Sequence, residues 1–235
     1  MTSIILFLAG IGAFGAWWLG KQRLTAKPWL EEGIAGEFPG TGALPVPAAK
    51  IGLGVFLAVV GALFALFISA YSMRMGMGDW RSVPTPPLLW VNTGMLVMSS
   101  VALQWAVVAS RRGEMDGVRA CLLAGGGFAV AFLAGQLWVW RQLTEGGYLL
   151  AGNPANSFFY LITGLHGLHM LGGLVALGRT TDRSWRSMEA DEVRLSVELC
   201  ALYWHFLLLV WLVLLFMLSS WGSEFLDICR QVLTS

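Results

Sequence analysis

Residues 199–223 read LCALYWHFLLLVWLVLLFMLSSWGS, an apolar run without a single Asp, Glu, Lys or Arg. At about 1.5 Å per residue, an α-helix of this length crosses the ~30 Å hydrocarbon core of a bilayer. Further uncharged runs long enough to do the same lie at residues 3–20, 51–73, 82–110, 120–140 and 146–178. Because backbone polar groups in lipid must pair within their own segment, each run predicts a transmembrane helix. We therefore predict an all-α integral membrane bundle with six transmembrane helices.

Two of these runs are longer than one span and start with residues typical of loops. The first contains Pro84, Pro86 and Pro87, and the second contains Gly152, Asn153 and Pro154. We therefore expect the helices themselves to begin near Leu88 and Ser157.

The composition excludes several classes of protein. Hydrophobic residues make up 57% of the 235 residues and charged residues only 12%, about half the share in a soluble domain. A net charge of +1 provides no basic excess for binding nucleic acid. Cys121, Cys200 and Cys229 lie far apart without a CxxC pair, which excludes a zinc ribbon, a thioredoxin-type pair and a haem-attachment motif. We interpret the cysteines as small apolar packing residues.

The basic residues predict the orientation in the membrane. The first, third and fifth loops hold eleven Lys and Arg residues, and the remaining extramembrane segments hold four. By the positive-inside rule, both termini face outside. Residues 3–20 read as a retained helix because their basic neighbours follow the apolar run. We expect one membrane domain over 1–235, with an N-terminal helix at 3–20, a cytoplasmic loop at 21–50 and a five-helix core at 51–222.

Polar side chains inside the spans are few. Asn92, Ser100 and Gln104 recur at a spacing that favours one face of the third helix, where we expect hydrogen bonds to other helices. His166 and His169 stand three residues apart on the fifth helix. His205, the remaining histidine, lies on the sixth.

His169 and His205 are predicted to lie at similar depths, about 14 and 11 Å from the inner ends of their helices, so the two imidazoles can meet. Glu198 is predicted at the inner start of the sixth helix, where the helix dipole favours a carboxylate. Three roles remain open for Glu198, His166, His169 and His205 as a group. The histidines can hold a haem or metal, Glu198 and His205 can relay protons, or the histidines can hydrogen-bond to neighbouring helices. No arrangement for nucleophilic catalysis is visible, so we assign no catalytic residue and no metal ligand.

Three stretches carry a resemblance to a known family: PLLWVNTGMLVMSS (87–100), NSFFYLITGLHGLH (156–169) and ELCALYWHFLLLVW (198–211). In collinear order they resemble subunit III of haem-copper respiratory oxidases, the cytochrome c oxidase subunit III family, over residues 50–222. The resemblance implies a helical subunit without redox centres that packs against subunit I. It implies phospholipid binding, support of proton uptake and protection of the oxidase during turnover, with haem and copper carried by partner subunits.

By matching position, Glu198 and His205 are the Glu and His of the family's E-x-x-x-x-Y-W-H-F motif, and His166 and His169 are those of G-x-H-G-x-H. Two positions depart from the family, because Val60 and Leu208 stand where many members carry carboxylates. One N-terminal helix also replaces the usual two. We expect Glu198 and His205 to form a polar seam near the inner surface of a bacterial plasma membrane.

Alternatives remain at this stage. Within the superfamily, the alternative is an accessory subunit of a quinol oxidase or a nitric-oxide reductase, because the electron donor enters through other subunits. A stand-alone transporter or membrane haem protein needs binding groups at mid-membrane, for which only the three histidines are available. A third alternative is a pure assembly scaffold, which differs from an accessory subunit only because it does not remain in the finished enzyme.

Overall fold

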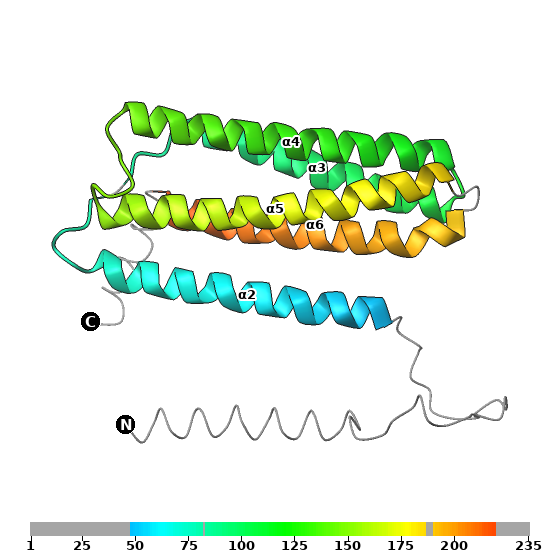
Figure 1. The fold of residues 1–235 in the computed structure, drawn as a ribbon, viewed down its shortest axis with the longest axis horizontal. Helices are drawn as coiled ribbons and strands as arrows, with labels where there is room; N and C mark the ends of the chain where they lie inside the picture. Colours follow the sequence, from blue (N-terminus) through cyan, green and yellow to red (C-terminus); the bar gives the residue numbers. More distant parts are fainter. Residues whose placement is uncertain (1–47, 82, 187–189, 220–235) are drawn as a thin grey trace, which may run out of the picture. The chain divides into compact units, whose positions relative to one another are not determined.

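Five long α-helices make up the part of the chain that the computed structural model describes, residues 48–81, 83–186 and 190–219 (Figure 1). They are α2 (Ala48–Met75), α3 (Leu88–Arg111), α4 (Met115–Glu145), α5 (Pro154–Arg186) and α6 (Ala190–Leu218). All five are long and apolar enough to cross a membrane. The all-α prediction and five of the spans are thus confirmed. The predicted helix at 3–20, nearly all of the 21–50 loop and both chain ends lie outside the described residues.

Most of these helices run beyond the uncharged stretches from which we predicted them. The first charged residue marks where the hydrocarbon core of the membrane ends, but it need not end the helix. A charged side chain is compatible with helix, particularly when it forms an ion pair with a side chain one turn away. Arg141 pairs with Glu145 in this way at 2.8 Å, and Arg186 pairs with Asp182 at 3.0 Å. The predicted start of α5 at Ser157 is three residues late, because proline is well tolerated in the first turn of a helix.

The end of α6 is the opposite case. We predicted a span to residue 223, yet the helix ends at Leu218. The Ser219 N–H still donates to the Leu215 carbonyl at 3.0 Å, and its hydroxyl donates to the Phe216 carbonyl at 2.7 Å. Residues 220–223 of the predicted span lie outside the described residues.

Four of the helices form a bundle. α3 packs against α4 and α6, and α5 packs against the same two helices, so that α3 and α5 are diagonally opposed. α2 lies along the side formed by α5 and α6 (Figure 1). A turn at Gly113, whose φ of 76° suits glycine, reverses the chain between α3 and α4. The described helices all belong to one unit, Val46–Ser235.

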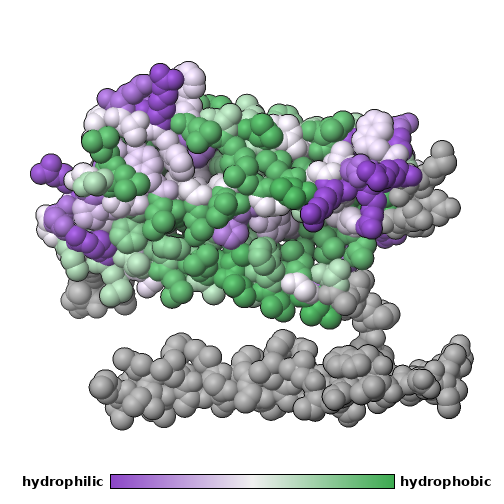
Figure 2. All heavy atoms as spheres, viewed as in Figure 1, coloured by the Kyte–Doolittle hydropathy of each residue, from purple (hydrophilic) through white to green (hydrophobic). Residues whose placement is uncertain are grey.

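Large aromatic side chains fill the bundle core. Trp204, Trp211 and Phe132 are almost completely buried, and the Phe132 and Trp211 rings meet edge to face at 4.9 Å. The face shown in Figure 2 is mostly hydrophobic along the helices, with hydrophilic residues gathered at their two ends. This distribution is that of a membrane protein, whose outer surface meets lipid.

Candidate functional site

His205 joins α6 to α3 through both of its ring nitrogens. The Ser100 Oγ lies 2.5 Å from Nδ1, and the Gln104 Oε1 lies 3.0 Å from Nε2. An amide oxygen only accepts, so a neutral His205 ring donates from Nε2 to Gln104 and accepts the Ser100 hydroxyl proton at Nδ1. The structure thus brings two of the three predicted polar residues of the third helix onto one predicted histidine.

Glu198 is surrounded by positive charge from three helices. Its carboxylate lies 2.8 Å from Lys50 Nζ of α2, 3.3 Å from Arg111 Nη2 of α3 and 3.5 Å from Arg194 Nε of α6. The predicted position at the start of the helix is wrong, because α6 begins at Ala190 and Glu198 lies more than two turns inside it. Its charge is therefore balanced by side chains rather than by the helix end.

One hollow of about 260 Å³ joins these two sets of contacts. Its lining includes Lys50, Arg111 and Glu198 together with Gln104 and His205. We call these residues, with Ser100 and Arg194, the α3/α6 cluster. It combines a carboxylate, an imidazole and an excess of cations at the end of the helices that the basic residues predict to be cytoplasmic.

His166 and Asn92 lie elsewhere, inside the bundle. The His166 ring is fully buried beside Phe132 and Trp211, at 5.9 and 5.2 Å between ring centroids, and neither of its nitrogens has a hydrogen-bond partner among the described residues. Asn92 is directed at Gly135 of α4, not at α6, so it departs from the face it was predicted to share with Ser100 and Gln104.

His169 and His205 are held by different helices. His169 Nδ1 lies 2.8 Å from the carbonyl of Leu165 in its own helix, and its ring packs on Phe64 of α2 at 5.5 Å. The hydroxyl of Tyr203 donates to the His169 carbonyl at 2.9 Å. Similar depth therefore does not bring the two imidazoles into one site, because they point to different neighbours.

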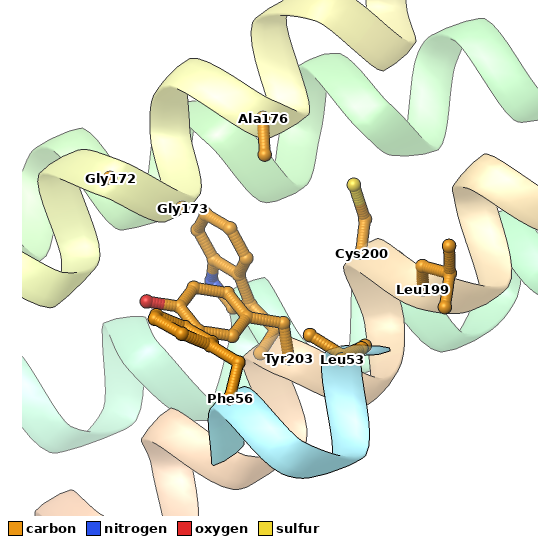
Figure 3. A pocket seen from close by; sticks show the side chains of 9 residues that line it. Leu53, Phe56, Gly172, Gly173, Ala176, Leu199, Cys200 and Tyr203 are labelled. Atoms are coloured by element: carbon orange, nitrogen blue, oxygen red, sulfur yellow. The ribbon is translucent and has the colours of Figure 1, made fainter. Parts of the chain in front are cut away.

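A second hollow, of about 290 Å³, lies where α2, α5 and α6 meet (Figure 3). We call it the α5/α6 groove. Its walls are apolar, and the rings of Phe56 and Tyr203 lie side by side at 6.1 Å along it. Gly172 and Gly173 open the wall on the α5 side. Another hollow, lined by Arg179 and Arg183, lies about two to three turns beyond Gly172 along α5.

The described residues contain no group of three His, Cys, Asp or Glu side chains placed to hold a metal ion.

Comparison with known proteins places this arrangement in a family. Residues 47–223, which include all five described helices, match the profile described as cytochrome c oxidase subunit III. The chain belongs to the cytochrome c oxidase subunit III family. It is 32% identical to the probable cytochrome c oxidase subunit 3 of Mycobacterium tuberculosis over 155 residues, or 65% of this chain and 75% of the relative.

Two further subunit 3 proteins are similar over slightly longer stretches. That of Corynebacterium diphtheriae is 29% identical over 170 residues, covering 69% of this chain and 83% of the relative. That of Thermostichus vulcanus is 30% identical over 169 residues, covering 70% and 83%. The resemblance inferred from the three sequence motifs is thereby confirmed, and the chain is a membrane protein of the oxidase subunit III type.

Val60 and Leu208, the two positions where the sequence was predicted to lack a family carboxylate, both lie in apolar surroundings. Val60 is buried at 3% exposure in an apolar cluster with Phe64, Ile162 and Leu214. Leu208 is partly buried against the main core. Both positions accept apolar residues because their surroundings are apolar.

Sequence reasoning missed the cations that hold Glu198. Arg194 was detectable, since it stands four residues before Glu198 on one helix. Lys50 and Arg111 were not, because they are 148 and 87 residues away in the chain. Gln136, buried with neither amide atom bonded to a described residue, was also missed because it is a single polar residue in an apolar run.

Proposed function

We propose that the chain is the non-redox accessory subunit III of a haem-copper terminal oxidase in a bacterial plasma membrane. It packs against subunit I, which carries haem and copper, and it contributes binding energy instead of a catalytic centre. The family match over residues 47–223 carries this proposal. The α3/α6 cluster supports it, since polar groups retained inside membrane spans are usually functional.

Phospholipid binding is the second part of the proposal. The α5/α6 groove offers an apolar trough for an acyl chain, with Gly172 and Gly173 providing depth. Arg179 and Arg183, about two and three turns beyond Gly172 along α5, provide positive charge for a phosphate. Basic pockets between helices on the cytoplasmic side suit anionic lipid head groups.

Support of proton uptake is the third part. Glu198 and His205 share one hollow, and both change charge by gaining or losing a proton. Because Val60 and Leu208 carry no proton, the carboxylate and imidazole of the α3/α6 cluster are the groups in that region of the chain that we assign to this role.

A mild-detergent purification of the tagged chain from its native membranes tests the assignment. We expect co-elution with a many-helix, histidine-rich subunit and a reduced-minus-oxidised haem spectrum in the same fraction. The remaining subunits then identify the electron donor. Recovery of the chain alone, or as an assembly of its own copies without haem, contradicts the proposal.

A further inference from the structure

Gln104 is an exposed polar side chain on a membrane-spanning helix. It lies seven residues before Arg111, which is the end of α3, and therefore about 10 Å inside that end. Its oxygen accepts from His205, while its amide nitrogen donates to no described residue. Acyl chains offer no acceptor, so a face that carries a free amide at this depth is unfavourable in plain lipid.

Apolar side chains surround Gln104 on this face. Val97 and Val101 of α3 and Leu202 and Leu209 of α6 are all exposed. An apolar surround with a few central hydrogen-bonding groups is the usual composition of a protein interface. In a membrane, interhelical hydrogen bonds add to packing in holding such an interface together.

The charges of the α3/α6 cluster are unequal. Among the described side chains, Lys50, Arg111 and Arg194 share one carboxylate, Glu198, so this set holds three positive charges and one negative charge. Lys50 and Arg111 are also 39% and 56% exposed, and both line the hollow of about 260 Å³. A hollow of this size admits a side chain and not a whole helix.

We infer that this face of α3 and α6 docks a transmembrane segment of the partner subunit, and that this segment places a carboxylate in the hollow. The inference rests on the proposed function and adds to it the docking face and the chemistry of the partner. A lipid phosphate reaches Arg111 at the membrane surface. A helix running beside α3 and α6 reaches Arg111 and also supplies an acceptor for Gln104 about 10 Å deeper.

Site-specific photo-crosslinking in native membranes tests the docking face. A benzophenone amino acid replaces Leu202 beside the hollow, or Leu123, an exposed residue of α4 that lies four residues inside Arg119 as Leu202 does inside Glu198. We expect the probe at 202 to form an adduct with the haem-bearing subunit, identified by mass spectrometry, and the matched probe at 123 to form none.

Several results overturn the inference. They are an adduct at 202 with lipid alone, an adduct with residues 1–47 of this chain, or equal yields of the haem-subunit adduct from both positions. In each case the chain still co-purifies with haem, so the proposed function stands. Failure of the unmodified chain to co-purify contradicts the proposed function itself.

A substitution provides an independent test. If Gln104 faces lipid, Gln104→Leu costs only the hydrogen bond to His205, so the thermal midpoint falls while retention in the complex stays at the level of the unmodified chain. If it faces the partner, we expect Gln104→Leu to lower retention several-fold at raised detergent, while the haem spectrum of the remaining complex is unchanged. Leu123→Ala serves as the matched control, and its retention is expected to stay at the level of the unmodified chain.

Discussion

At the scale of single residues, close packing decides which positions tolerate change. Gly172 and Gly173 are neighbours on α5, yet their surroundings differ completely. A Cβ at Gly173 would lie 2.7 Å from a ring carbon of Tyr203 and 2.8 Å from one of Trp204, while a Cβ at Gly172 would meet nothing within 4 Å. Glycine is thus required at only one of the two positions, because aromatic rings cannot yield as flexible side chains do.

Gly173→Ala is therefore expected to lower the free energy of unfolding by about 1–3 kcal/mol through overpacking. Gly172→Ala is the control and is expected to be neutral. The thermal midpoint of the purified protein in mild detergent, followed by tryptophan fluorescence, measures both. Equal midpoints for the two variants would show that α5 and α6 do not approach as closely as described.

Glu198 has ion-pair partners on three helices, α2, α3 and α6. Glu198→Ala leaves Lys50 and Arg111 without their shared carboxylate, so we expect weaker assembly or a shorter turnover lifetime with an intact haem spectrum. Glu145→Ala, which breaks an exposed pair within α4, is expected to have little effect. Loss of the haem signal in a complex that still assembles would contradict the accessory role.

At the scale of helices, α2 depends on few contacts. Much of its surface is exposed, and its buried side chains are Val60, Phe64 and Tyr71. Phe64 packs on the rings of His166 and His169 at 6.3 and 5.5 Å. Lys50 adds the ion pair to Glu198. α2 is thus the helix most easily detached from the bundle, because its buried face is the narrowest.

Phe64→Ala is expected to lower the free energy of unfolding by about 3 kcal/mol or more, because it leaves a cavity between α2 and α5. Leu66→Ala changes a side chain that is 69% exposed on the same helix and is expected to be nearly neutral. Thermal midpoints in detergent compare the two. A Phe64→Ala midpoint equal to that of Leu66→Ala would mean that α2 is held by other contacts.

The turn after α2 carries a weak pH dependence. Arg74 Nη1 bonds Asp79 Oδ1 at 2.7 Å, which holds the pKa of the Asp79 carboxyl below its ordinary value. Because the pKa of Asp79 is lower in the folded protein, the ion pair stabilises the fold at pH values above the ordinary carboxyl pKa of about 4. This stabilisation is lost as the pH falls through the lowered pKa of the folded protein. Asp79→Asn is expected to remove this small contribution from the acid limb of the midpoint–pH curve, which thermal unfolding at a series of pH values measures. An unchanged acid limb would show that the Arg74–Asp79 pair does not contribute to stability.

At the scale of the whole molecule, the distribution of charge predicts which end of the helices faces the cytoplasm. The α3–α4 connection lies at the basic end, and the α4–α5 connection lies at the other. With the three native cysteines replaced by alanine, Leu150→Cys is expected to react with an impermeant maleimide on intact cells. Glu114→Cys is expected to react only after permeabilisation. The reverse pattern would invert the orientation and place the α3/α6 cluster outside.

The sequence by itself determined the all-α class, the described spans and the family, because hydrophobic length and local motifs are properties of contiguous residues. It also selected Ser100, Gln104 and His205 as polar exceptions within apolar runs, and Glu198 as a carboxylate directly before one. Only the tertiary structure decided their partners. Helix rotation directs Asn92 to α4 and His166 into the aromatic core, and chain packing brings Lys50 to Glu198. These pairings depend on which helices become neighbours, and residue periodicity within one helix does not encode that choice.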